Sequence, residues 1–164
     1  GGMDSLFERL ILDEDDAVKD AAANALAQIG QPAVAMLFDL LERGGPDLQW
    51  RAARAIGQTG TAAKSVVPRL KRAFGNSSIH VRIEAVDAVW KISRDSNLVA
   101  ATLVRMLSED SRQVRRRAAT LLVELKTLPR ETSRELEEFA AGGSSKEARA
   151  AVYVLRERFR KADQ

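Results

Sequence analysis

The chain repeats one pattern five times, and this periodicity constrains its fold more than any other feature. Each copy starts from an anchor residue, and successive anchors are separated by 30, 33, 33 and 34 residues. The anchors are Val18, Leu48, Val81, Val114 and Ala148. With few exceptions, apolar or small residues recur at offsets 0, 4, 7, 8 and 11 from the anchor, which is one face of an α-helix. A repeat of this length predicts a stack of similar helical units that share one core.

A second signal keeps the same register as the apolar stripe. The residue three positions before each anchor is of a type that can cap a helix N-terminus, namely Asp15, Gly45, Ser78, Ser111 and Ser145. Between these anchor helices lies a shorter apolar pattern of helical period, bounded by loops rich in Gly, Pro and Ser. Two helices per repeat are therefore expected, and ten in all.

The expected organisation is one domain over residues 4–164, preceded by Gly1-Gly2-Met3, which resembles a remnant of an expression tag. The domain is divided into five two-helix units, approximately 4–30, 31–60, 61–93, 94–127 and 128–162. No single unit has enough apolar surface for a core of its own, so neighbouring units must stack.

The consensus Val-Arg-x-x-Ala-Ala-x-Ala-Leu-Gly-x-Ile-Gly resembles the HEAT-like repeats named after phycobilisome lyases, a type found in many uncharacterised bacterial proteins, and the likeness covers residues 4–160. The resemblance implies an all-α, right-handed α-α superhelix, an armadillo-like solenoid of about five two-helix repeats. It also implies that the anchor helices line a concave surface. The fifth unit departs from the pattern at Arg156, where the other units are apolar, as expected of a terminal unit.

Composition excludes several classes of function. The chain has no Cys and one His, which excludes disulfides and thiolate catalysis and disfavours multi-histidine metal sites. It contains neither a glycine-rich phosphate loop nor a Ser-His-Asp set, so we expect no cofactor and no metal, and the residues favour a protein without enzymatic activity. No stretch of about 18 uncharged apolar residues is present, and no signal peptide is recognisable, so a cytoplasmic location without membrane contact is expected.

Charge is unevenly distributed along the chain. Residues 1–50 carry 3 basic and 10 acidic side chains, whereas residues 51–164 carry 23 basic and 13 acidic ones. This asymmetry could recruit an acidic partner to the second part of the chain, or produce weak head-to-tail self-association. A solvated surface with unevenly spread charge is the alternative.

Positions at offsets 2, 6 and 9 point away from the apolar stripe and are predicted to face the groove of the array. Both tryptophans occupy such positions, and Trp and Arg supply many binding hot spots. We therefore predict a partner-binding groove formed by Trp50, Arg54, Ile83, Asp87, Trp90, Arg116, Thr120 and Val123. The alternative is that the two tryptophan rings pack against neighbouring helices.

A basic residue recurs at offset 1 as Lys19, Arg82, Arg115 and Arg149. It could form a phosphate-binding ladder, but a position that repeats in each unit more often bonds a loop or the adjacent unit. We therefore interpret it as structural.

A protein-binding scaffold is the favoured function, because it needs only a rigid curved surface with aromatic anchors. Nucleic-acid binding is one alternative, since Trp50, Asp87, Trp90 and Arg116 are loosely similar in residue type to the groove of HEAT-like alkylpurine DNA glycosylases. The acidic first unit and the net charge of +3 argue against it. The third possibility is a subunit of a bilin lyase or a chromophore chaperone, in which stacked aromatic rings of the groove hold the pigment and Arg54 or Arg116 pairs with its propionates.

Overall fold

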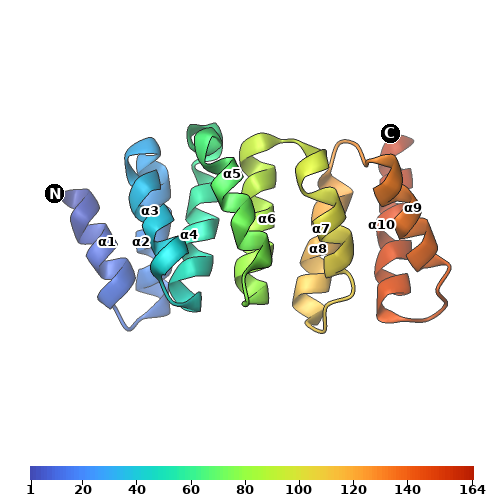
Figure 1. Cartoon of the computed structure of the whole chain (residues 1–164), viewed down its shortest axis with the longest axis horizontal. Coiled ribbons are helices and arrows are strands. Elements are labelled where there is room, and N and C mark those ends of the chain that lie inside the picture. Colours follow the sequence, from blue (N-terminus) through green and yellow to red (C-terminus); the bar gives the residue numbers. More distant parts are fainter. The chain divides into compact units, whose positions relative to one another are not determined.

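The computed structural model describes all 164 residues, which form ten α-helices linked by turns and 3₁₀ helices, with no β-strand (Figure 1). The all-α fold class predicted from the repeat is confirmed. The helices divide into two compact units, Gly1–Arg94 and Asp95–Gln164. None of the helices has the uncharged apolar stretch that a bilayer crossing would need.

The first unit contains three anchor-bearing helices, each paired with a preceding helical segment. Its elements are α1 (Gly2–Leu12), α2 (Asp16–Ile29), α3 (Gln31–Arg43), α4 (Pro46–Gln58), η1 (Gly60–Val66), α5 (Val67–Leu70), η2 (Lys71–Gly75) and α6 (Ile79–Ser93). Helix α1 packs on α2 and α3 packs on α4, while the anchor-bearing helices follow one another in contact, α2 on α4 and α4 on α6. Instead of one helix, α6 has the run η1, α5 and η2 as its partner.

This broken run has a local cause. Gly60 adopts a φ of +63° at its start, and Pro68 lies in the first turn of the four-residue helix α5. Proline has no N–H to donate to the preceding turn, so a continuous helix across this segment would lose a backbone hydrogen bond. The apolar pattern predicted the helical period here but not the interruptions.

The second unit contains two helical pairs. Its elements are η3 (Ser96–Leu98), α7 (Ala100–Met106), α8 (Arg112–Glu124), α9 (Arg130–Ala140) and α10 (Lys146–Ala162). Helix α7 packs on α8 and α9 packs on α10, and the pairs join through contacts of α8 with α10 and of α7 with α9. Helices α8 and α10 are therefore neighbours with a shared surface.

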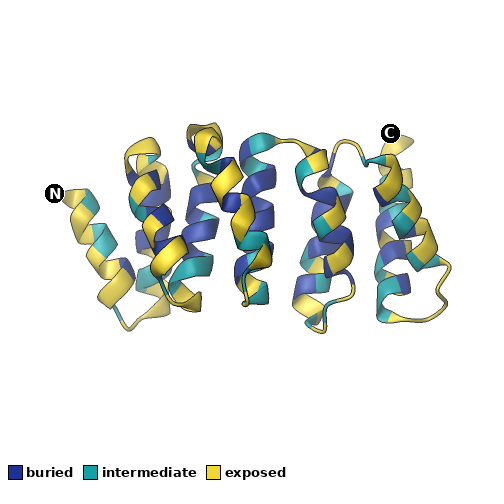
Figure 2. Cartoon of the chain, in the orientation of Figure 1, coloured by how far each residue is buried: buried dark blue, intermediate teal, exposed yellow.

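Most buried residues of the anchor helices follow the predicted stripe (Figure 2), but Ile29, Val152 and Phe159, which the pattern places on it, are 39%, 48% and 71% exposed. In α8, for example, Val114, Ala118 and Leu122 are at most 2% exposed. Full burial of a leucine side chain contributes about 1.5–3 kcal/mol, so burial of the stripe stabilises each unit.

Side-chain caps begin three of the anchor helices as predicted. Asp15 accepts a hydrogen bond from the Ala17 N–H, and Ser111 and Ser145 each accept one from the backbone N–H three residues later. Ser78 occupies the cap position of α6, but its side chain makes no capping bond. The register of the caps thus matches the register of the core.

Two anchor helices of the first unit, α4 and α6, approach one another closely at Gly57. A Cβ atom built on this glycine would lie 2.8 Å from Ala88 Cα and 2.9 Å from Ala88 Cβ. Real Cβ atoms do not approach backbone so closely, so the absence of a side chain at Gly57 sets the distance between α4 and α6. The small residues of the repeat therefore act as spacers for helix packing.

Candidate functional site: a basic groove in the second unit

The eight residues predicted to form a groove fall in different units and in different environments. Trp50, Arg54, Ile83, Asp87 and Trp90 lie in the first unit, and Arg116, Thr120 and Val123 lie in the second.

Trp50 and Arg54 are close together, but they belong to an ion-pair cluster. Trp50 is half-buried, and the guanidinium carbons of Arg51 and Arg54 lie 4.3 and 4.6 Å from its ring centroid. Arg54 Nη2 donates to Asp20 Oδ1 at 2.9 Å. Two cations therefore contact the indole ring, and both are paired with aspartates.

Arg51 is the centre of this cluster and was not predicted. It is only 2% exposed, yet it pairs with Asp16 and Asp20 of α2 at 2.8 and 2.9 Å and with Asp47 of its own helix. Burial acts to lower the pKa of Arg51, but its hydrogen bonds and charge interactions with Asp20 and Asp47 outweigh burial and raise it. The cluster ties α2 to α4 and is structural.

The expectation that Ile83, Asp87 and Trp90 face an open groove is wrong. They are 2%, 4% and 3% exposed, and Asp87 pairs with Lys91 at 2.8 Å. Helix α6 contacts α4, α5, η1 and η2, and ten of its fifteen residues are buried. A helix that is covered on several sides has no single solvent face, so the helical wheel assigned these positions to a surface that does not exist.

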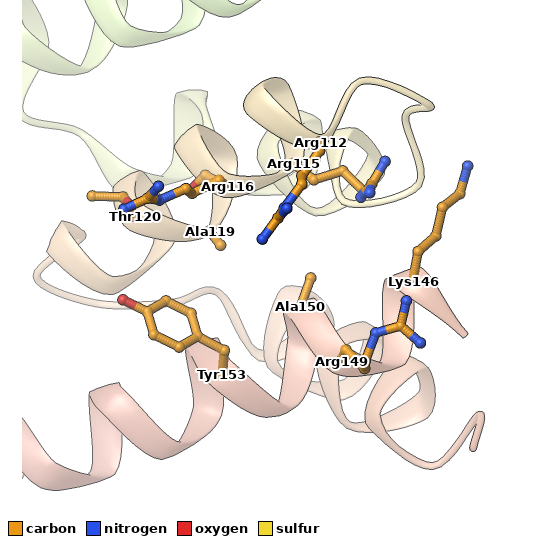
Figure 3. A pocket seen from close by; sticks show the side chains of 9 residues that line it. All are labelled: Arg112, Arg115, Arg116, Ala119, Thr120, Lys146, Arg149, Ala150 and Tyr153. Carbon is orange, nitrogen blue, oxygen red and sulfur yellow. The ribbon is translucent and has the colours of Figure 1, made fainter. Parts of the chain in front are cut away.

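Arg116 and Thr120 of α8 are exposed and line a hollow between α8 and α10 (Figure 3). This hollow, hereafter the basic groove, has a volume of about 730 Å³. Its lining residues are Arg112, Arg115, Arg116, Ala119, Thr120, Lys146, Arg149, Ala150 and Tyr153.

Val123, the third predicted residue of this unit, does not line the basic groove. It is half-buried and borders a smaller hollow with Lys126 and Arg158. Arg158 donates to the carbonyls of Leu122 and Leu125 at 2.8 and 2.6 Å, at the C-terminus of α8. Burial lowers the pKa of Arg158. This end of α8 is therefore closed by a structural contact.

The side chains of the basic groove have distinct positions along its length (Figure 3). Tyr153 and Thr120 lie at one end and Lys146 at the other, with Ala119 and Ala150 facing one another between them. Tyr153 is 47% exposed. The two alanines leave room for the main chain of a ligand, and the tyrosine offers an aromatic surface beside them.

Five of the nine lining residues are cations and none is acidic. Arg112 and Arg116 are exposed, and the structure contains no hydrogen bond or ion pair from either guanidinium. Lys146 Nζ lies 2.6 Å from Oδ1 of Asp110, a fully exposed residue. The hydrogen bond and the charge of Lys146 lower the pKa of Asp110. The groove thus presents a strong positive charge without a matching acid in its wall.

The other two cations are partly committed to loops. Arg115 donates to the carbonyls of Glu109 and Asp110 at 2.7 and 2.6 Å, and Arg149 donates to the carbonyl of Ser144. In the first unit Arg82 likewise donates to the carbonyl of Asn76 at 2.8 Å. The interpretation of the repeated offset-1 cation as a loop-bonding residue is confirmed at these three positions.

At the fourth position, Lys19 pairs with Asp47 of the adjacent repeat at 3.2 Å. This contact belongs to the other structural class that the sequence suggested, a bond to the neighbouring unit.

Sequence reasoning missed Arg112, Lys146 and Tyr153 as groove residues. Arg112 and Lys146 occupy the same position, two residues before their anchors, and a comparison of the last two repeats at that position would have revealed the cationic pair. Tyr153 stands at offset 5, which the helical wheel places beside the predicted groove positions.

The cations of the groove suit an anionic ligand. Its wall contains no acid, histidine or thiol, and its groups with acid-base or nucleophilic chemistry are Lys146, Tyr153 and Thr120. The structure also contains no cluster of three or more His, Cys, Asp or Glu side chains that could hold a metal ion.

Comparison with known proteins identifies the family to which the repeats belong. The family profile described as HEAT repeats matches residues 3–89 and 34–124. No curated protein matches the chain.

Similar solved structures include the complex of CpcE and CpcF of phycocyanin lyase from Nostoc sp. PCC7120, with 17% identity, a TM-score of 0.72 and coverage of 96% of this chain and 98% of that one. They also include a designed armadillo repeat protein in complex with the peptide (KR)4, with 17% identity, a TM-score of 0.57 and coverage of 96% and 82%. An engineered protein matches with 19% identity, a TM-score of 0.58 and coverage of 96% and 79%. At these identities the likeness shows a common fold.

Proposed function

The chain belongs to the HEAT repeats family, and from that premise we propose that it is a non-enzymatic scaffold that binds an acidic segment of a partner protein in the basic groove of its second unit. The observation that carries the proposal is the set of five cations around a hollow with no acid in its wall.

The residue types of the groove suit an acidic peptide. Guanidinium groups bind carboxylates through two parallel hydrogen bonds, and the exposed, unpaired Arg112 and Arg116 are available for this. Ala119 and Ala150 allow the peptide main chain to approach, and Tyr153 can pack against an apolar side chain of the ligand. Each exposed ion pair contributes up to about 1 kcal/mol, so several carboxylates must bind together to give useful affinity.

Two structural neighbours support a binding role for this architecture. One is a subunit pair, the complex of CpcE and CpcF, and another is a designed repeat protein in complex with a peptide of alternating lysine and arginine. The basic groove described above has the charge that would select the opposite kind of peptide, one rich in Asp and Glu.

Nucleic acid is the weaker ligand class for this groove. The second unit carries 14 Lys and Arg but also 11 Asp and Glu. Two of these acids, Asp110 and Glu147, adjoin Lys146 at one end of the groove. A surface that follows a phosphate backbone needs a continuous positive stripe, usually with several aromatic rings for single strands. The groove has one ring and an acidic border.

A chromophore-binding role loses its main support. Such a role depended on two stacked tryptophan rings, but Trp90 is buried and Trp50 is in contact with the cations of Arg51 and Arg54.

The test is the binding of fluorescein-labelled hexaglutamate to the whole chain, followed by fluorescence anisotropy. The groove variant Arg112→Glu/Arg116→Glu should weaken binding at least about tenfold, since two favourable pairs become repulsive. The control is Arg130→Glu, which changes an exposed cation at the start of α9, where a negative charge is favourable. Equal binding by the groove variant and the control would refute the proposal, and so would tighter binding of a single-stranded oligonucleotide of the same charge.

A further inference from the structure

The turn between α1 and α2 is the most acidic exposed segment of the first unit. We define the acidic turn as Leu12–Asp16, which contains four consecutive acids after an exposed leucine. The side chain of Asp13 accepts a hydrogen bond from the Asp15 N–H at 2.9 Å, and Asp15 accepts one from the Ala17 N–H at 2.8 Å. These bonds fix the turn, so little conformational entropy remains to be lost when it binds.

We propose that the acidic turn of one copy of this chain occupies the basic groove of a second copy, which gives a reversible head-to-tail association. The inference rests on the proposed function, because it concerns the same groove and names an occupant for it. The acidic turn carries four carboxylates, one of which, Asp16, already pairs with Arg51, and the basic groove carries five cations. Complementary charge of this kind selects the register and accelerates encounter.

The acidic turn is short enough to lie within the basic groove. Because Leu12 ends α1 and Asp16 begins α2, the turn is compact, and its first and last Cα atoms lie closer together than the about 13 Å that five extended residues could span. Tyr153 and Lys146 are seven residues apart on α10, which is about 10 Å along a helix. When the carboxylates lie at the Lys146 end of the groove, Leu12 can reach the ring of Tyr153 at the other end (Figure 3).

The apolar pair adds a contact that charge alone does not supply. Leu12 is 74% exposed and Tyr153 is 47% exposed, and each is among the large apolar side chains that the fold leaves in water. Their contact would remove both surfaces from solvent. In the sequence Leu12 comes directly before the four acids. In the groove Tyr153 lies at one end and Lys146 at the other, so the apolar and the charged contacts follow the same order (Figure 3).

The interface is heterologous, because the turn and the groove are different surfaces. A pair formed by one such contact keeps one free turn and one free groove, so further molecules can add and association should grow with concentration. Because the contact is largely ionic and exposed, salt should dissociate it.

Sedimentation velocity of the whole chain tests the inference at about 0.02 M and about 0.5 M salt, where the screening lengths are near 20 Å and 4 Å. At low salt the weight-average mass should exceed the 18.0 kDa of the monomer and rise with concentration, and at high salt it should return to the monomer. The control Arg130→Glu should associate like the unmodified chain.

Complementation by two variants identifies the surfaces. Glu14→Lys alters the acidic turn without touching its two capping aspartates, and the groove variant alters the groove. Each alone should be monomeric at low salt. An equal mixture should regain a dimer, because the intact groove of the first variant accepts the intact turn of the second.

The outcomes separate the two proposals. A chain that remains monomeric at low salt, or variants whose mixture remains monomeric, would overturn the self-association even where hexaglutamate binds the groove. Glu14→Lys should bind hexaglutamate at least as well as the unmodified chain, because its groove is intact and free. Persistent association of Glu14→Lys would also overturn the inference, since it would require a different contact.

Discussion

Substitution of Gly57 by alanine is expected to destabilise the protein, although alanine favours helices. The added Cβ would lie 2.8 Å from Ala88 Cα and 2.9 Å from Ala88 Cβ, whereas carbon atoms in contact prefer about 3.5–4.0 Å. The nearest atom is backbone and cannot rotate away. Helices α4 and α6 must therefore separate by roughly 0.7–1 Å, and other contacts along their interface weaken.

The expected magnitude is the difference between two opposing terms. Overpacking of a tight core contact costs about 1–3 kcal/mol, and we take the upper value because backbone is involved. Replacement of glycine by alanine inside a helix contributes about 1 kcal/mol in the other direction. The net loss is about 2 kcal/mol, which lowers the melting temperature by about 4–8 °C for a chain of this size.

Urea denaturation followed by circular dichroism measures this loss. The matched control is Gly75→Ala, because a Cβ at Gly75 meets no atom within 4 Å, and its stability should change by less than about 0.5 kcal/mol. In the double variant Gly57→Ala/Ala88→Gly the contact at 2.9 Å disappears, but the contact at 2.8 Å with backbone remains. The two substitutions should thus be less destabilising together than the sum of their separate effects. Equal or greater stability of Gly57→Ala alone would show that helix propensity outweighs packing, and would refute the reasoning.

Four further effects are expected. Ser145→Ala removes a side-chain cap of α10 and should cost about 1 kcal/mol in urea denaturation, while the fold is retained. Arg51→Met should cost only about 1–2 kcal/mol, less than the 3–5 kcal/mol typical of broken buried pairs, because the carboxylates that it leaves behind reach water; a larger loss would contradict this. Burial acts to raise the pKa of Asp47, but its bonds to Lys19 and Arg51 outweigh burial and lower the pKa. The stabilisation from Asp47 is therefore complete above the unfolded pKa of about 3.9 and is lost as pH falls through the lower folded pKa. In Asp47→Asn the free energy of unfolding should thus fall less steeply with decreasing pH in the acid range. Arg116→Gln should raise the free energy of unfolding slightly while weakening hexaglutamate binding. A loss of stability together with the loss of binding would mean that Arg116 supports the fold.

The features that sequence predicted well are those fixed by short segments of chain. The paired helices, the caps at Asp15, Ser111 and Ser145, and the loop bonds of the offset-1 arginines each depend on residues within about six positions of one another. Periodicity and local hydrogen bonding determine such features directly.

The candidate site depended on contacts that no single helix reveals. A helical wheel gives the direction of a side chain, but whether Ile83 or Trp90 meets water depends on how many neighbours surround α6. Tyr153 and Arg112 share a hollow because α8 and α10 pack side by side, and that relation crosses more than 30 residues of sequence. Arg116 and Thr120 were predicted because their helix does keep an open face.

The two units differ in the charges that face one another between neighbouring anchor helices, and this contrast explains why the second unit holds the candidate site. In the first unit, acids of α2 face arginines of α4, so Arg51 and Arg54 are neutralised by Asp16 and Asp20. In the second unit both helices of the corresponding pair carry cations, and the hollow between them has no acid in its wall. Like charges that share a hollow lower the stability of the folded chain. A ligand that carries carboxylates relieves this repulsion when it binds, so part of its affinity comes from an unfavourable interaction already present in the free protein. The unpaired state of Arg112 and Arg116 is what an anion-binding surface requires, and ion pairing of the kind found in the first unit would remove it.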